Sequence, residues 1–97
     1  MALIESIETA HYRVPLPVVL SDSTHGLMDC FALVTVRITD ADGVTGTGYT
    51  YSVGDIGGGA IHSLLERDLA PLLRGKDASA IESVWEAMWW YLHFVGR

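Results

Sequence analysis

The chain has 97 residues, 49% hydrophobic and 19% charged, a composition typical of one globular domain and not of a disordered segment. Its formal net charge is −6 and its six basic residues are scattered, which disfavours nucleic acid and an anionic membrane surface as partners. A single cysteine excludes an internal disulfide, and no apolar run approaches the ~18 residues of a membrane span. The N-terminus has no signal-peptide pattern, so we expect a cytoplasmic protein.

Residues 3–14 are predicted to form the first strand, because apolar and polar residues alternate there, although imperfectly. Pro15 and Pro17 follow, and neither can donate a hydrogen bond to a sheet. We therefore expect the chain to leave the sheet at this point. The polar segment Leu16–Asp29 is expected to be a long loop.

Residues 30–39 give the clearest strand signal, since β-branched residues alternate there between two faces. Asp42-Gly43 predicts a tight hairpin, because glycine accepts a positive φ, and residues 44–51 should pair antiparallel with the first run. Cys30 begins the apolar face and is expected to be a buried structural thiol. The residues of that face are Cys30, Ala32, Val34, Val36 and Ile38.

From Ala60 the apolar period becomes helical, and Pro71 should end the regular part of this helix near Leu69. A second helix is predicted from about Asp77, a good N-cap, although residues 79–82 also fit a capping box. The second helix is apolar around nearly its whole circumference. Such a helix requires cover on more than one face.

The glycine-rich stretch at residues 46–65, "GTGYTYSVGDIGGGAIHSLL", invites comparison with phosphate-binding loops. Tyr51 stands where a dinucleotide fingerprint needs its third glycine, and Gly75-Lys76 is followed by Asp77 where a P-loop needs Ser or Thr. Loop mobility explains the glycines better. An anion held by the bare N–H groups of the helix start is the lesser alternative.

Two groups of polar side chains are candidate sites. Asp22, His25 and Asp29 share the first predicted loop and could meet at a cation, but a solvated polar loop is favoured. Tyr49 and Tyr51 are expected on one strand face beside the glycine-rich loop, where a phenol could meet a ligand. The residues themselves indicate a small α+β domain with two loops and no catalytic constellation.

Four motifs, in chain order, carry a family resemblance: "VPLP", "DADGVTGTGYTY", "LAPLLRGKD" and "IESVWEAMWWYLHFVGR". Together they resemble the N-terminal domain of the enolase superfamily, in particular its mandelate racemase and muconate lactonizing branch. The resemblance covers residues 1–97 as a single domain. It implies an α+β fold, in which a three-stranded antiparallel sheet and a following helical portion cap a (β/α)₈-like barrel.

In that family the barrel carries the reaction: a base removes the proton next to a carboxylate, and Mg²⁺ stabilises the ene-diolate. This chain ends about where such a barrel, of ~250 residues, would begin. The resemblance therefore implies no catalytic and no metal-binding residue in this chain, and no activity for the chain alone. It implies two partners, the barrel domain of the same enzyme, which would bind Mg²⁺, and a small carboxylic acid substrate.

The resemblance also implies that two loops, Leu16–Asp29 and Tyr51–Gly58, close on the substrate. Glycines would let the second loop swing, and closure would exclude water. The reaction expected is that of a racemase, dehydratase or cycloisomerase, with an acid sugar or a 2-hydroxy acid favoured as the substrate. The candidate substrate contacts are Ser21, His25, Tyr51 and Ser52.

A different class of function is also open, a non-catalytic module that associates with itself. The aromatic residues around Trp85–Phe94 would form an uncovered apolar surface, and such surfaces mark interfaces. A homo-oligomer is expected in either case.

Overall fold

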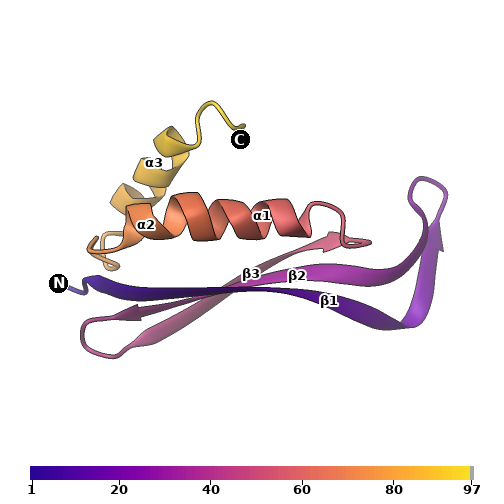
Figure 1. The fold of residues 1–97 in the computed structure, drawn as a ribbon, viewed down its shortest axis with the longest axis horizontal. Coiled ribbons are helices and arrows are strands. Elements are labelled where there is room, and N and C mark those ends of the chain that lie inside the picture. Colours follow the sequence, from indigo (N-terminus) through magenta and orange to yellow (C-terminus); the bar gives the residue numbers. More distant parts are fainter. Residues whose placement is uncertain (97) are drawn as a thin grey trace.

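The computed structural model describes residues 1–96 and shows a three-stranded antiparallel sheet with helices on one of its faces (Figure 1). The strands are β1 (Ile4–Asp22), β2 (Gly26–Asp40) and β3 (Thr45–Val53), and β2 lies in the middle. The helical portion consists of α1 (Gly58–Leu64), the π-helical segment η1 (Leu65–Leu69), α2 (Ala70–Leu73) and α3 (Ile81–Tyr91). The predicted α+β architecture is confirmed. Arg97, which the predicted domain 1–97 includes, lies outside the described residues.

The prediction that the first strand ends at Pro15 was wrong. β1 continues to Asp22, and Pro15 still lies opposite Cys30 on β2. β1 is an edge strand, so a proline there can lack its N–H without leaving a neighbouring strand unpaired. The pairing register then shifts between Pro15 and Leu20, and this irregularity accommodates Pro17.

The segment Leu16–Asp29, predicted as a loop, is consequently a hairpin, which we call the β1–β2 arm. Beyond the register shift, Leu20 pairs with Met28 and Asp22 pairs with Gly26. Only residues 23–25 form a turn, and Gly26 closes it with a φ of 71°. The arm bends toward the side of the sheet that carries the helices (Figure 1).

The turn between β2 and β3 agrees with the Asp42-Gly43 prediction, because Gly43 has a φ of 85°. Asp40 stabilises it, since its Oδ1 atom accepts hydrogen bonds from the backbone N–H groups of Asp42 and Val44 at 2.9 and 3.0 Å. The predicted apolar face of β2 is confirmed as the core face at Cys30, Ala32 and Val34, whereas Val36 and Ile38 on the same face are only half-buried. The buried apolar residues are Ile4, Cys30, Ala32, Val34, Leu69, Ala70 and Leu73.

The first helix does not end at Leu69, contrary to the prediction, but runs on through Pro71 to Leu73. A proline inside an α-helix leaves one carbonyl without its donor and clashes with the preceding turn. Here the turn before Pro71 is widened to a π-helix, and the N–H of Ala70 bonds to the carbonyl of Leu65, five residues earlier. Leu69, Ala70 and Leu73 thereby keep facing the sheet and stay buried.

The second helix begins at Ile81 and not near Asp77. Asp77 binds the start of the chain instead: its Oδ1 atom accepts the backbone N–H of Ala2 at 3.0 Å and the Ser79 hydroxyl at 2.6 Å. Backbone bonds continue this contact, from Ile4 N–H to Lys76 carbonyl and from Ala78 N–H to Ala2 carbonyl, at 2.8 and 2.7 Å. The segment before α3 is therefore tied to the edge of the sheet, which delays the helix.

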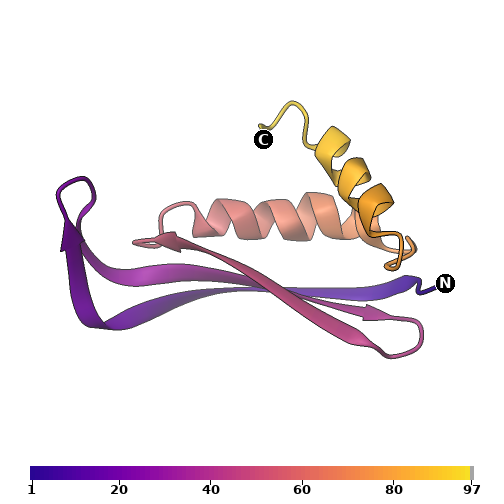
Figure 2. The same cartoon turned by 180° about the vertical axis from the view of Figure 1, so that it is seen from behind.

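α3 projects away from the sheet beyond the end of α2 (Figure 2). None of its residues is buried, and Trp85 and Trp90 are each 59% exposed. The Cα radius of gyration is 15.8 Å, against about 13 Å for a compact chain of this size. The expectation that this apolar helix needs cover from outside the chain fits its position.

Candidate functional site

Two irregular segments lie at the same end of the sheet, on the side that carries the helices (Figures 1 and 2). One is the β1–β2 arm, residues 16–29. The other, which we call the glycine loop, is Gly54–Gly57, between β3 and α1. β3 extends to Val53, so this loop is shorter than the predicted Tyr51–Gly58. The sheet thus brings together two segments that are about thirty residues apart in the sequence.

The tip of the arm is organised by Asp22. Its Oδ1 atom accepts the backbone N–H groups of Thr24 and His25, and its Oδ2 atom lies 2.9 Å from the Nδ1 atom of His25. The hydrogen bonds from the His25 backbone and ring lower the pKa of the Asp22 carboxyl. Because Nδ1 faces the carboxylate, the Nε2 edge of His25 is the edge turned to solvent at the arm tip.

The glycine loop has a defined conformation that its residue types explain. Gly54 and Gly57 have φ angles of 70° and 81°, which glycine adopts without strain. Two hydrogen bonds hold the loop at its start: the Gly54 N–H donates to the Cys30 carbonyl at 2.9 Å, and the Ser52 hydroxyl donates to the Ile56 carbonyl at 2.5 Å. The glycines therefore serve conformation, and the swinging motion inferred from the sequence stays a prediction.

Asp55 links this loop to the sheet. Its Oδ1 atom lies 2.8 Å from the Nε2 atom of His11, on the helix-facing side of β1. A carboxylate has only acceptors, so His11 Nε2 is the donor. Asp55 has a φ of 58°, the only positive φ among the non-glycine residues described. The pair is partly shielded, since the side chains of His11 and Asp55 are 26% and 33% exposed.

The start of α1 packs directly on this pair. A Cβ atom on Gly58 would lie 2.5 Å from His11 Nε2, 2.7 Å from the Ala32 Cβ atom and 3.0 Å from Asp55 Oδ1. Only glycine leaves room for α1 to approach the sheet so closely. Gly58 thus has a packing role that the sequence pattern alone did not reveal.

A second polar contact joins the same surfaces one turn further along the helix. The Thr9 hydroxyl donates to Glu66 Oε1 at 3.4 Å and lies 3.0 Å from His62 Nε2, from which it accepts. The sequence alone did not single out His11, Thr9 or Asp55 as site residues. One signal was available, a histidine on β1 that lies opposite Val34 and so shares the core face of the sheet.

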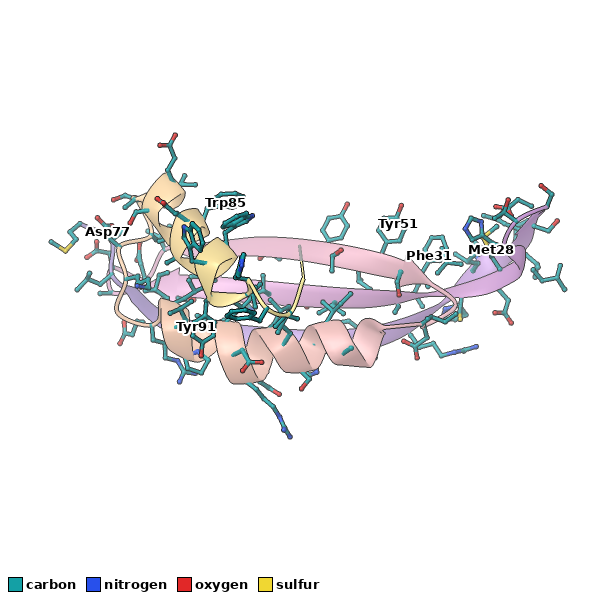
Figure 3. The ribbon with its side chains drawn as sticks, turned by 90° about the horizontal axis from the view of Figure 1, so that it is seen from above. Met28, Phe31, Tyr51, Asp77, Trp85 and Tyr91 are labelled. Carbon is teal, nitrogen blue, oxygen red and sulfur yellow. The ribbon has the colours of Figure 1, made fainter. Side chains whose placement is uncertain are left out.

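The four candidate substrate contacts are not brought together on one surface. Ser21 and His25 lie on the arm. Ser52 faces the helices at the base of the glycine loop, opposite Ala32. Tyr51, as the next residue in the strand, points to the other face of the sheet. Its ring lies 5.3 Å from the Phe31 ring, and both are labelled in Figure 3.

The sheet face that carries Tyr51 has a shallow hollow of about 230 Å³. Tyr49 shares this face, as the sequence predicted, and both tyrosines are largely exposed. The residues that line the hollow are Val14, Phe31, Leu33, Tyr49 and Tyr51.

A larger apolar groove, of about 690 Å³, runs along α3. Three tryptophans line it, and one of them, Trp85, is labelled in Figure 3. Two carboxylates, of Glu82 and Glu86, border it. The lining residues are Ile81, Glu82, Trp85, Glu86, Trp89 and Trp90.

Within residues 1–96, no three His, Cys, Asp or Glu side chains converge as a metal site requires. The weighed trio of Asp22, His25 and Asp29 reduces to the contact between Asp22 and His25. No helix in the same residues is both long and apolar enough to cross a membrane.

Residues 4–92 match the family described as "Mandelate racemase / muconate lactonizing enzyme, N-terminal domain". A curated relative, 3,6-anhydro-alpha-L-galactonate cycloisomerase of Streptomyces coelicolor, is 53% identical over 95 residues, which are 98% of this chain and 26% of the relative. Two solved structures share the fold over nearly the whole chain. A magnesium-bound racemase of Streptomyces coelicolor A3(2) is 54% identical, with a TM-score of 0.94 over 98% of this chain and 26% of its own. L-talarate/galactarate dehydratase of Salmonella typhimurium LT2, liganded with Mg and L-lyxarohydroxamate, is 26% identical, with a TM-score of 0.88 over 99% of this chain and 25% of its own.

The chain thus spans about a quarter of the length of the proteins that it matches.

Proposed function

Because the chain belongs to the mandelate racemase / muconate lactonizing enzyme family, as its N-terminal domain, we propose that it is the capping and specificity domain of a magnesium-dependent enzyme of that family. The enzyme acts by removing the proton next to a carboxylate, as a racemase, dehydratase or cycloisomerase. The barrel domain supplies the reacting groups. This chain covers the substrate and selects it.

One observation carries this proposal: the arm and the glycine loop lie at one end and on one side of the sheet. A lid must present movable or shaped segments at one place, above the reaction centre. The arm offers the His25 imidazole and the Ser21 hydroxyl, and Ser52 lies at the base of the glycine loop. These side chains suit a polar acid with several hydroxyl groups.

The substrate class follows from the relatives. Their names specify an anhydro-galactonate cycloisomerase and a talarate/galactarate dehydratase, both of which act on acid sugars. We therefore favour an acid sugar, with a 2-hydroxy acid as the next choice. Ser21, His25, Tyr51 and Ser52 are the proposed substrate contacts, and Tyr51, on the other sheet face, is tested separately from the rest.

Magnesium accompanies both of the solved structures described above. The described residues of this chain provide no set of ligands that fits the ion. We assign Mg²⁺ to the barrel of the full enzyme.

α3 is proposed to dock on that barrel. Trp85 and Trp90 are exposed in this chain, and an apolar groove of this size on one helix is best covered by a neighbouring domain. The docking would also fix the orientation of the sheet, and hence of the arm and the glycine loop, over the barrel.

The test is a substrate screen on the enzyme that contains both domains, with Mg²⁺ present. We expect turnover of at least one acid sugar and none by the 97-residue chain alone. Turnover by the isolated chain would contradict the capping role, and a two-domain enzyme inactive on every carboxylic acid tried would contradict the reaction class.

The exposed α3 also favours a second candidate, a module that associates with itself. Phe94, just beyond α3, is 99% exposed, as an interface residue of a separated subunit would be. In this case the tryptophan surface would pair with a second copy of the chain. Sedimentation of the chain with and without its barrel distinguishes the two candidates.

A further inference from the structure

The contact between His11 and Asp55 joins the glycine loop to the sheet, and it involves neither of the arm residues named above. Asp55 is the only residue of the loop with a charged side chain. Its carboxylate reaches 2.8 Å to a histidine that is 44 positions earlier in the sequence. The contact therefore ties a side chain of the loop to β1, and it is separate from the bond that Ser52 of β3 makes to the Ile56 carbonyl.

Several features show that the loop is built around this contact. Asp55 adopts a φ of 58°, which costs free energy for a residue with a side chain, and Asp and Asn tolerate it better than most. Gly58 lies against the contact between His11 and Asp55, where a side chain would not fit. The helix start, the loop and β1 thus converge on a single hydrogen bond.

The contact determines where Ile56 lies. Ile56 follows Asp55 directly, is 79% exposed and has its carbonyl held by the Ser52 hydroxyl. An apolar side chain held out to solvent at a loop tip is placed to contact something outside this domain. Fixing Asp55 on one side and the Ile56 carbonyl on the other leaves this side chain little freedom of position.

We propose that His11 and Asp55 are positioning residues, which hold the glycine loop in the conformation that binds substrate. The inference rests on the proposed function, since it assumes that the loop covers a substrate. Neither residue touches the substrate. Their effect is to keep the binding-competent conformation populated. This lowers the apparent dissociation constant, which equals the intrinsic constant divided by the fraction of loops in that conformation.

The experiment uses the two-domain enzyme and the variant Asp55→Gly, because glycine keeps the positive φ and removes the hydrogen bond. It also makes the backbone more flexible, an effect that the control must match. Asp55→Asn is the conservative variant, since asparagine retains an acceptor and tolerates this φ. The matched control is Asp42→Gly in the exposed β2–β3 turn, at the other end of the sheet (Figure 1). It adds the same flexibility without touching the loop.

The first measurement is amide hydrogen exchange of Ile56 and Gly57 without substrate. We expect Asp55→Gly to accelerate exchange about tenfold, the factor that loss of one charge-assisted hydrogen bond gives. Asp55→Asn and Asp42→Gly should leave the rates near those of the unaltered enzyme. Unchanged exchange in Asp55→Gly would overturn the proposal whatever the enzyme's activity.

The second measurement is steady-state kinetics on the best acid-sugar substrate. Asp55→Gly should raise KM up to about tenfold with kcat nearly unchanged. In Asp55→Asn, KM should stay close to that of the unaltered enzyme. The double variant His11→Leu/Asp55→Gly should be no worse than Asp55→Gly alone, because both remove the same contact. Faster exchange with an unaltered KM would overturn the role in binding.

The two measurements separate failure of this inference from failure of the proposed function. Hydrogen exchange needs no substrate, so it decides whether the pair holds the loop even if the enzyme accepts no acid. An enzyme that turns over no carboxylic acid refutes the proposed function and, with it, the role in binding.

Discussion

Gly58 lies directly beneath the imidazole of His11, so that a Cβ atom at position 58 would stand 2.5 Å from Nε2. The next glycine, Gly59, belongs to the same helix and has no atom within 4 Å of its hypothetical Cβ. Two adjacent glycines of one helix therefore have opposite roles. Gly58 allows a close approach between helix and sheet, whereas Gly59 leaves a space that alanine could occupy.

We expect Gly58→Ala to lower the free energy of unfolding by about 1–3 kcal/mol, because the new methyl group forces α1 away from His11 and Ala32. Gly59→Ala is the matched control and should raise stability by up to about 1 kcal/mol through its helix propensity. Denaturant unfolding of the two variants, followed by far-UV circular dichroism, measures both. Equal effects of the two substitutions would contradict the close approach.

Asp77 predicts a dependence of stability on acid pH. Hydrogen bonds from Ser79 and from the Ala2 backbone lower the pKa of its carboxyl from 3.8 to about 2. A pKa that is lower in the folded chain stabilises the fold above pH 4, and this contribution is lost as the pH falls from about 4 through 2. Thermal unfolding midpoints measured across that range should fall, and they should fall less in Asp77→Asn.

The control for Asp77 is Asp42→Asn, at an exposed residue of the β2–β3 turn. It should leave the acid dependence of the midpoint in place. If Asp77→Asn and Asp42→Asn give the same profile, the contact between Asp77 and Ala2 does not contribute to stability in solution.

The exposed apolar surface of α3 leads us to expect that the chain self-associates when its barrel is absent. Trp85 and Trp90 are each 59% exposed beside an apolar groove, so burying them against any apolar surface is favourable. Sedimentation velocity of the 97-residue chain should show species larger than a monomer, and Trp85→Gln/Trp90→Gln should shift them toward monomer. Tyr49→Ser, at an exposed residue of the sheet, is the control that should not.

If the chain sediments as a monomer at high concentration, the exposed surface of α3 does not mediate self-association. In that event the proposal that α3 docks on a barrel would need support from the two-domain enzyme. There the same double substitution should still lower the free energy of unfolding.

The proposed substrate contacts can be tested one by one in the two-domain enzyme. His25→Asn removes the imidazole at the arm tip, and we expect it to alter substrate preference or turnover by about tenfold or more, the scale of a lost polar contact to a substrate. Tyr51→Phe should act similarly if its phenol meets the ligand, whereas Tyr49→Phe is its control on the same strand. Kinetics unchanged for every acid would remove the residue concerned from the set of contacts.

Ser52 requires a different interpretation. Its hydroxyl already donates to the Ile56 carbonyl, so Ser52→Ala should act through the glycine loop as well as through any substrate contact. Faster amide exchange at Ile56 in Ser52→Ala, without substrate, would identify the loop as the route.

The sequence alone was enough for features that depend on local periodicity and turn chemistry. Alternation predicted that Cys30, Ala32 and Val34 face the core, and they are buried. The Asp42-Gly43 pair predicted a hairpin, because only a residue without a side chain takes the φ of that turn easily. The family and the α+β fold followed from the order of such elements.

The tertiary structure decided what the two prolines do. Pro15 stays in a strand because β1 is at the edge of the sheet, and a sequence does not state which strand is the edge. Pro71 stays in a helix because the preceding turn widens to a π-helix, and burial of Leu69 and Leu73 against the sheet favours that continuation. In both places local propensity was overruled by neighbours distant in the sequence.

Contacts between residues distant in the sequence also explain which parts of the site could not be predicted. The sequence identified the two segments, since polar and glycine-rich stretches are visible locally. It did not reveal that His11 meets Asp55 or that Gly58 packs against both. These relationships depend on strand register and helix packing, which act between residues more than forty positions apart, and so only the folded chain determines them.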